Sequence, residues 1–445
     1  MARIFKPSIK RKPVSSDKAP ARLLIDSFSI EGRGLAKHQG KTVFVEGALP
    51  EEDVSVAHYR RHKRYSECSV KKVLSPSAYR VKPTCSYFGV CGGCQLQYLA
   101  TSQQVVYKQT AVINDLVHHL GTDDFQVLEP ITSSENYRSR ARMVVSQHAQ
   151  LCFRKKQSDQ LVPITQCQVF SSALQPLVPT IQHWLNSLSP RSGVTHIEFV
   201  DSHKGVAIVV RHVKPLSLVD RQQLQDGCDT YLAQIWFQPE KGGALNDAKG
   251  SPCDPRLFYD LPKYDIQIGF HPSDFTQVNQ AVNLQMVDQA IDWLDLKTSD
   301  TVLDLFCGVG NFTLPIALHV AAVIGIEGVA TMSQRATDNA SLNQIENAVF
   351  KTKNLDADNL GSALESFSVN KFLLDPPRSG ALKVCEQLTQ SGVERGVYIS
   401  CNPTTFIRDV VILRNNGFKL KAIRMLDMFL HTSHIETMAL FEKVS

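Results

Sequence analysis

The alternation of apolar and polar positions follows one pattern in the first eighty residues and another in the last third of the chain. Between residues 22 and 73, short alternating stretches separated by turn residues predict a small β-barrel. From about residue 280 onward, apolar runs typical of buried strands alternate with amphipathic helical stretches. That order predicts a doubly wound parallel sheet, so the expected fold class is α/β with a smaller barrel before it.

The expected strands can be placed by residue. In the first region they are Leu23–Ile30, Lys41–Val45, Val54–Tyr59 and Cys68–Val73. In the last region they are Thr301–Leu305, Val323–Ile326, Val349–Lys353, Phe372–Leu374 and Val397–Ser400, closed by the pair Lys419–Met425 and Thr437–Phe441. The middle of the chain is expected to be mixed, with a helix at Ala100–Leu120 and strands at His196–Val200 and Val206–Val210. The predicted division is a basic disordered tail at 1–20, the barrel at 21–80, a central α+β domain at 81–265 and the α/β domain at 266–445.

Charge is distributed unevenly along the chain. The net charge is only +5, but residues 1–80 hold 17 basic and 8 acidic residues, while the remainder holds 31 and 35. This excess predicts that the N-terminal region binds a polyanion. Within it, Tyr59–Tyr65 interleaves basic and aromatic residues, which favours nucleic acid over a merely solvated hairpin. Arg138, Arg140 and Arg142 would share one side of a strand, facing either solvent or phosphate.

No apolar run reaches the roughly 18–20 residues that span a bilayer, and the first residues lack a signal-peptide core. We therefore expect a cytoplasmic protein that does not enter a membrane, with its 11 cysteines reduced. Clustered cysteines then indicate a metal site or catalysis rather than disulfides. Cys85, Cys91 and Cys94 lie close together and Cys167 follows. Four thiolates suit zinc or an iron–sulfur cluster, and the spacing leaves both open.

A glycine-containing turn follows the first expected strand of the α/β region. Gly308 and Gly310 allow a tight bend and close approach to a ligand, and Glu327 ends the next strand, where a carboxylate can bind a ribose diol. The third glycine of a dinucleotide motif is missing, because Thr313 occupies its place. Asp304 adds negative charge where a phosphate would lie. A cationic nucleoside, S-adenosylmethionine, therefore fits better than a dinucleotide.

Two further strand ends suit methyl transfer to a pyrimidine carbon. Asp375 and Cys401 follow the fourth and fifth expected strands, whose carboxyl ends converge on one edge of the sheet. A thiolate that adds to C6 of uracil makes C5 nucleophilic enough to accept a methyl group, and a base then removes the C5 proton. Glu436 is preferred as that base over His434, although spacing barely separates them. The alternatives are a buried structural thiol at Cys401 and amine methylation directed by Asp375 and the prolines after it.

Together these motifs resemble the RumA/RlmD group of uridine-C5 RNA methyltransferases over nearly the whole chain. The resemblance implies an N-terminal TRAM barrel with an OB-like fold, a central domain carrying a 4Fe-4S cluster, and a Rossmann-like domain that uses S-adenosylmethionine. It implies Cys401 as nucleophile and Glu436 as base, and it favours iron–sulfur over zinc. The family's F-x-Q-x-N motif is present as Phe275–Asn279. The implied cluster ligands are Cys85, Cys91, Cys94 and Cys167, and the implied cofactor residues are Gln277, Phe306, Asn311, Glu327, Asn354 and Asp375.

The resemblance also suggests the substrate. Members with both a TRAM barrel and the four cysteines act on a 23S ribosomal RNA uridine of the RumA/RlmD type, whereas tRNA-specific members lack both. We therefore expect 23S rRNA as the partner of a monomer with no obligate protein partner. The alternatives are another 23S rRNA or tRNA uridine, or a non-catalytic iron–sulfur RNA-binding protein. The latter predicts loss of Cys401, Asp375 or Glu436, and all three are present.

Overall fold

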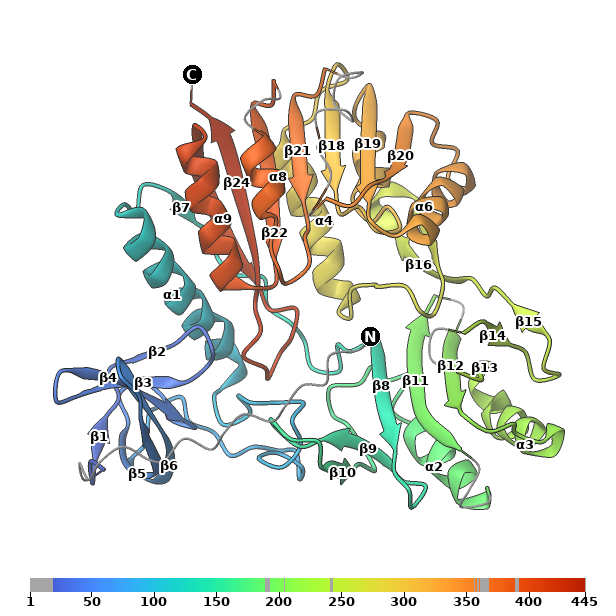
Figure 1. The fold of residues 1–445 in the computed structure, drawn as a ribbon, viewed down its shortest axis with the longest axis horizontal. Helices are drawn as coiled ribbons and strands as arrows, with labels where there is room; N and C mark the ends of the chain where they lie inside the picture. Colours follow the sequence, from blue (N-terminus) through green and yellow to red (C-terminus); the bar gives the residue numbers. More distant parts are fainter. Residues whose placement is uncertain are drawn as a thin grey trace, which may run out of the picture. The chain divides into compact units, whose positions relative to one another are not determined.

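The computed structural model describes residues 19–188, 193–203, 205–240, 243–355, 357, 360, 368–388 and 392–444. The predicted tail at 1–20 therefore lies almost wholly outside the described residues. The chain divides into two compact units, Met1–Val81 and Lys82–Ser445 (Figure 1). The finer division at residue 265 stays a prediction. In the described part of the chain, no helix is both long enough and apolar enough to cross a bilayer.

The first unit is built on a six-stranded sheet with the order β1-β5-β6-β4-β3-β2. Its core includes Val43, Val45 and Val54, all fully buried. The stretch expected as one strand from Leu23 to Ile30 is instead two short strands, because the backbone changes its partner there: the N–H of Ile25 still donates to Glu52 beside β5, whereas that of Asp26 donates to Leu35 on β3. The strands are β1 (Leu23–Leu24), β2 (Ser27–Phe28), β3 (Gly34–His38), β4 (Lys41–Glu46), β5 (Asp53–Arg61) and β6 (Tyr65–Ser75), of which β3 was not expected.

The basic segment Tyr59–Tyr65 is less of a hairpin turn than expected. Strand β5 continues to Arg61, so only residues 62–64 connect it to β6. The ring of His62 stacks on Tyr65, with centroids 4.4 Å apart, and lies 3.0 Å from the carboxylate of Glu67. Tyr65 is 37% exposed. The segment thus presents an aromatic ring on a strand end rather than on a free loop.

The second unit begins with helix α1 and an eight-stranded sheet whose order is β10-β9-β8-β11-β12-β13-β14-β15. Strands β16 and β17 form a separate antiparallel pair that leads to the last third of the chain. The helical elements of this part are α1 (Thr101–Leu120), α2 (Leu177–Ser187), α3 (Leu218–Cys228), η1 (Asp229–Tyr231) and η2 (Pro262–Tyr264). The strands are β8 (Arg140–Val145), β9 (Leu151–Arg154), β10 (Leu161–Pro163), β11 (Val194–Ser202), β12 (Gly205–His212), β13 (Gln234–Gln238), β14 (Leu245–Asn246), β15 (Pro252–Cys253), β16 (Leu257–Leu261) and β17 (Ile266–Phe270).

The last third of the chain contributes most of a second eight-stranded sheet, with the order β20-β19-β18-β21-β22-β24-β23-β7 and helices along it (Figure 1). From β18 the chain moves outward through β19 to β20, then crosses back to β21 on the other side of β18. The strands are β7 (Gln126–Val127), β18 (Thr301–Leu305), β19 (Ala322–Glu327), β20 (Ala348–Thr352), β21 (Lys371–Leu374), β22 (Arg395–Ser400), β23 (Phe418–Leu426) and β24 (Glu436–Lys443). The helices are α4 (Gln280–Leu294), α5 (Thr313–Ala317), α6 (Ala330–Leu342), α8 (Leu382–Gln387) and α9 (Pro403–Asn415).

All seven strands expected in this sheet are present, each within two residues of its expected ends. Five are parallel, and β23 and β24 form the expected antiparallel pair. The eighth strand, β7, lies more than 150 residues earlier in the chain and pairs with β23 in parallel. Two residues with no periodicity carry no signal for such a long-range pairing, so the sequence could not reveal it.

Candidate active site

The eight residues assigned to catalysis and cofactor binding line one cavity of about 660 Å³. The cavity lies at the carboxyl ends of the parallel strands, where the strand order reverses between β18 and β21. An open α/β sheet binds its ligands at such a switch point. The lining residues from the predicted set are Gln277, Phe306, Asn311, Glu327, Asn354, Asp375, Cys401 and Glu436.

The turn after β18 has the conformation that its glycines allow. Gly308 and Gly310 have φ values of 57° and 97°, and Phe306 also has a positive φ of 66°. The turn is tied to the end of β19, because the N–H of Gly308 donates to one carboxylate oxygen of Glu327 at 3.1 Å. The N–H of Val329 donates to the other oxygen at 2.9 Å. Each carboxylate oxygen keeps a second lone pair, so Glu327 can still accept bonds from a ligand hydroxyl.

Asn311 is held by neighbours from two other elements. Its amide pairs reciprocally with the amide of Asn283 on α4, with both bonds at 3.0 Å. The hydroxyl of Tyr259 on β16 donates to the same oxygen of Asn311, also at 3.0 Å. This pairing orients the Asn311 amide at the cavity wall.

A buried carboxylate lies beneath the turn. Asp304 is fully buried on β18 and accepts a hydrogen bond from the hydroxyl of Thr313. Burial, together with the nearby carboxylates of Asp375 and Glu327, raises the pKa of Asp304 to about 7. Its Oδ1 atom has no hydrogen-bond partner among the described residues. Asp304 can therefore still accept a hydrogen bond at Oδ1, and it would add negative charge beside the cavity when ionised.

The pairing of β22 with β24 brings Cys401 and Glu436 to the same end of the sheet. These strands are antiparallel, and Ser400 pairs with Thr437. Cys401 directly follows Ser400 in the chain, and Glu436 directly precedes Thr437. The thiol and the carboxylate therefore adjoin the same end of this pairing, and both residues line the cavity.

The start of α9 joins the two strand-end motifs. Asn402 caps this helix by accepting from the N–H of Thr404 at 3.2 Å, and Pro403 occupies the first helical position. The amide of Asn402 also donates to the carbonyl of Arg378 at 2.8 Å, and Thr405 donates to the same carbonyl at 3.2 Å. The turn after β21 and the turn after β22 are thereby fixed to each other.

The charged groups of the cavity act on one another. Burial, with the charges of Glu436 and Asp375, raises the pKa of the Cys401 thiol to about 11, although Arg378 acts in the opposite direction. Burial and Asp375 together hold the pKa of Glu436 well above its usual range, and burial raises that of Asp375 to about 7. The cavity by itself therefore favours protonated side chains. A cationic ligand placed there would favour their ionised forms.

His434, the other candidate base, is exposed and is not among the described residues that line the cavity. Its ring is approached by the guanidinium of Arg378 at 3.3 Å. Although the residue is exposed, its ring is partly enclosed, and this enclosure together with the charge of Arg378 lowers the pKa of His434. The structure thus places Glu436, and not His434, in the cavity with Cys401.

Several lining residues were not predicted, among them Tyr259, Met332, Phe429 and Arg378. Arg378 directly follows the Asp375-Pro-Pro turn, so its position could have suggested a role. Tyr259 lies in a stretch where we found no chemical motif. No local pattern could have shown that it reaches the cavity.

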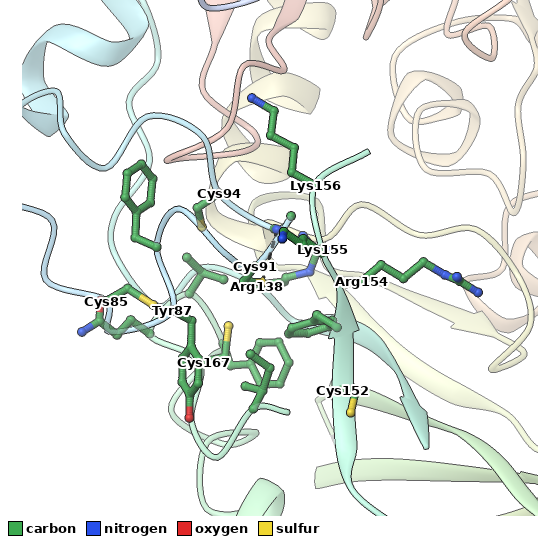
Figure 2. A pocket seen from close by; sticks show the side chains of 18 of the residues that line it. Cys85, Tyr87, Cys91, Cys94, Arg138, Cys152, Arg154, Lys155, Lys156 and Cys167 are labelled. Carbon is green, nitrogen blue, oxygen red and sulfur yellow. Dashed lines mark hydrogen bonds between the residues drawn. The ribbon is translucent and has the colours of Figure 1, made fainter. Parts of the chain in front are cut away.

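The four clustered cysteines line a second cavity of about 620 Å³. Figure 2 shows the side chains of Cys85, Cys91, Cys94 and Cys167 grouped around it, with Cys152 further away on a strand. The backbone N–H of Gly93 donates to the sulfur of Cys91 at 3.4 Å. Among the described residues, no three His, Cys, Asp or Glu side chains are placed to hold a metal ion.

Burial is the main influence on the pKa of Cys94 and Cys167. Together with neighbouring thiols of the same cavity, it raises the pKa of Cys94 to about 12 and that of Cys167 to about 11. Arg138 acts in the opposite direction on Cys167. The cavity is also lined by Arg142, Arg154, Lys155 and Lys156. It thus combines soft sulfur ligands with a cationic rim.

The expected stripe of three arginines does not act as one surface. Arg142 is about half exposed and pairs with Glu198, whereas the side chain of Arg140 is only 17% exposed. The guanidinium of Arg140 donates to the carbonyls of Pro272 and Asp274, just before the Phe275–Asn279 motif. We predicted that the row of arginines faces either phosphate or solvent. Neither alternative applies to Arg140.

Comparison with known proteins identifies the family. The family model described as tRNA (Uracil-5-)-methyltransferase matches residues 263–444. The 23S rRNA (uracil(1939)-C(5))-methyltransferase RlmD of Vibrio vulnificus strain CMCP6 is 38% identical over 100% of both chains. That of Nitrosococcus oceani is 40% identical over 98% of both.

A solved structure shows the same fold. The tRNA (uracil-54, C5)-methyltransferase of Pyrococcus abyssi, in complex with S-adenosyl-L-homocysteine, matches with a TM-score of 0.71 and 20% identity. The match covers 94% of this chain and 100% of that one. With full-length relatives at 38–40% identity, this chain belongs to the RlmD family of 23S rRNA (uracil-C5)-methyltransferases.

Proposed function

We propose that this protein transfers a methyl group from S-adenosylmethionine to C5 of a uridine in 23S rRNA. The target is the uridine that the names of its relatives number 1939. The observation that carries this proposal is that Cys401 and Glu436 line one cavity together with the turn that contains Gly308. A nucleophile, a base and a nucleoside-binding turn thus meet in one place.

The cofactor is held by the side of the cavity formed by β18 and β19. Glu327 binds the ribose diol, and the open turn at Gly308 and Gly310 admits the nucleoside close to the backbone. The remaining cofactor contacts come from Gln277, Phe306, Asn311, Asn354 and Asp375. When bound, S-adenosylmethionine supplies an electrophilic methyl group on a positively charged sulfur.

Cys401 begins the reaction by adding to C6 of the uracil, and its thiol proton passes to the carboxylate of Asp375. The electron pair of the C5–C6 bond moves toward C5 and O4, and C5 takes up the methyl group. Glu436 then removes the C5 proton, the C5–C6 double bond re-forms, and the Cys401 sulfur leaves. Division of one difficult substitution into these steps is the advantage of covalent catalysis. One proton is released to solvent overall.

The uridine must leave its stack to reach Cys401. Unstacking costs least for single-stranded or loop RNA. Phe275, 67% exposed at the cavity, offers a ring on which a displaced base can stack. We propose that the TRAM barrel at 21–80 and the cationic rim of the cysteine cavity hold the flanking RNA. In this arrangement the protein acts as a cytoplasmic monomer.

We further propose that Cys85, Cys91, Cys94 and Cys167 hold a 4Fe-4S cluster. The donor set fits, because four cysteine thiols line one cavity and iron–sulfur clusters are held by cysteine thiolates. Gly92 leaves room for this loop, since a Cβ there would come within 3.0 Å of the Arg154 carbonyl oxygen. The cluster would join the loop of the first three cysteines to the segment containing Cys167.

The activity is tested by incubation of the purified protein with 23S rRNA fragments and labelled S-adenosylmethionine, followed by nucleoside analysis. Label in 5-methyluridine at the position equivalent to 1939 is expected. Label in another base would contradict the reaction, and label in another uridine would contradict the target. Visible absorption of anaerobically purified protein tests the cluster. A colourless preparation that contains zinc would overturn that assignment.

A further inference from the structure

Two buried polar side chains on α1 have no part in the reaction steps above. Gln104 and Lys108 are 0% and 1% exposed. They lie four residues apart, so they project from the same face of the helix. Both contact residues 427–435, the connection between β23 and β24, which we name the base loop because Glu436 follows it.

Lys108 gathers three oxygens of the base loop around its ammonium group. Its Nζ donates to Asp427 Oδ1 at 2.6 Å, to the carbonyl of His434 at 3.0 Å and to that of Thr432 at 3.4 Å. An ammonium group has three hydrogens to donate, so the three oxygens match its full capacity. Asp427 is also only 1% exposed, which makes this a buried ion pair.

Gln104 fixes the middle of the same loop. Its Oε1 accepts from the N–H of His431 at 2.8 Å, and its Nε2 lies 3.1 Å from Nδ1 of that ring. His431 has a φ of 68°, which residues other than glycine rarely adopt. The surrounding contacts must therefore maintain this backbone conformation. The N–H groups of Gln95 and Leu96 complete the clamp by donating to the His431 carbonyl, at 2.8 and 2.9 Å.

The contacts at His431, Thr432 and His434 lie within five residues of Glu436. The bond from Lys108 to the His434 carbonyl is only two residues before Glu436. We propose that Gln104 and Lys108 are positioning residues for Glu436, holding the base loop so that the carboxylate faces Cys401 and the C5 proton. The inference rests on the proposed function. It assigns to α1 a role in the elimination step and none in cofactor binding.

The test uses two variants that leave no unpaired buried charge. One combines Lys108→Met with Asp427→Asn, which neutralises both members of the pair, and the other is Gln104→Met. We expect kcat to fall about 10- to 100-fold, because a small displacement of a catalytic group has this cost. The KM for S-adenosylmethionine should stay within about twofold of that of the wild type. Because elimination is the slowed step, a denaturation-resistant RNA–protein adduct should accumulate.

Lys419→Met is the matched control, because Lys419 pairs with Asp124 at the surface of the same unit. It should change neither kcat nor the adduct. Folded variants that turn over at the wild-type rate, or that slow without adduct, would overturn the inference. Hydrogen exchange of the wild type provides an arm without variants: the His431 amide should exchange as slowly as those of α1, and fast exchange would count against the clamp. Failure of the proposed function would show separately, as wild-type protein that forms no 5-methyluridine.

Discussion

The protein contains two thiol-lined cavities of nearly equal size, about 660 and 620 Å³, whose surroundings are opposite in charge. The first holds Cys401 among carboxylates, including Glu436 and Asp375. The second holds four cysteines beside arginine and lysine side chains. In both, burial is the main reason that thiol pKa values are raised.

The two cavities differ in the kind of ligand that would favour ionisation of their thiols. Carboxylates around Cys401 favour a cationic ligand, which would make ionisation of the thiol easier when it arrives. Around the other cavity, neighbouring thiols raise the pKa of Cys94, and replacement of their protons by the proposed cluster would relieve that effect. In our proposal the thiol thus serves chemistry in one cavity and structure in the other.

The largest effect is expected from Cys401→Ala, which tests the proposed chemical role of the first cavity. Without its nucleophile the protein should lose uridine methylation by more than about 10⁴-fold. Nucleoside analysis of 23S rRNA fragments measures the loss. Cys253→Ala, a thiol that lines neither cavity, should stay within about twofold of wild type. If Cys401→Ala kept its activity, methylation of an amine would become the better explanation.

Glu436→Gln should leave nucleophilic addition and methyl transfer possible but block removal of the C5 proton. Turnover should fall by about 10³-fold, and a covalent RNA–protein adduct should accumulate. Denaturing gel electrophoresis with labelled RNA detects the adduct. An inactive, folded variant without adduct would argue that Glu436 has another role.

In the second cavity, Cys94→Ser should act on stability rather than on the chemical step. Loss of a cluster ligand should lower the free energy of unfolding by about 4 kcal/mol and remove the visible absorption. Thermal unfolding followed by circular dichroism, together with iron analysis, measures both effects. Cys152→Ser, which changes a more distant thiol of the same cavity, serves as the control and should retain its iron. Wild-type protein that contains no iron would contradict the assignment of a cluster to this cavity.

The smallest expected effect concerns the ionisation of Cys401 in the protein without ligand. With its pKa at about 11, alkylation of this thiol should rise about tenfold per pH unit up to that value. At pH values where Glu436 is ionised, Glu436→Gln removes a negative charge, so it should lower the pKa of Cys401 and speed its alkylation. Arg378→Gln removes a positive charge and should slow it. Peptide mass spectrometry resolves Cys401 from the other thiols, and a change in the same direction for both variants would indicate altered access instead of charge.

The strand ends were predictable because each carries its own local signal. The seven expected strands of the C-terminal sheet are buried apolar runs, and the residues after β18, β21 and β22 all reach one cavity as the parallel topology requires. Contacts between distant segments were not predictable. Tyr259 reaches Asn311 across 52 residues, and Arg140 reaches the carbonyl of Asp274 across 134, and neither belongs to a local pattern. The proposed role of Lys108 was not predictable for the same reason, because its partners lie in the base loop, far from α1 in the sequence.

The antiparallel pairing of Ser400 with Thr437 has a consequence for how such an enzyme tolerates insertions and deletions. The distance between Cys401 and Glu436, the proposed nucleophile and base, is set by a ladder of backbone hydrogen bonds and not by the length of the chain between them. Residues could be added between β22 and β23 without moving either group. A single residue inserted directly after Glu436, with the rest of β24 kept in register, would instead turn Glu436 to the opposite face of the sheet. In our proposal, that one added amino acid would cost as much as loss of the carboxylate itself.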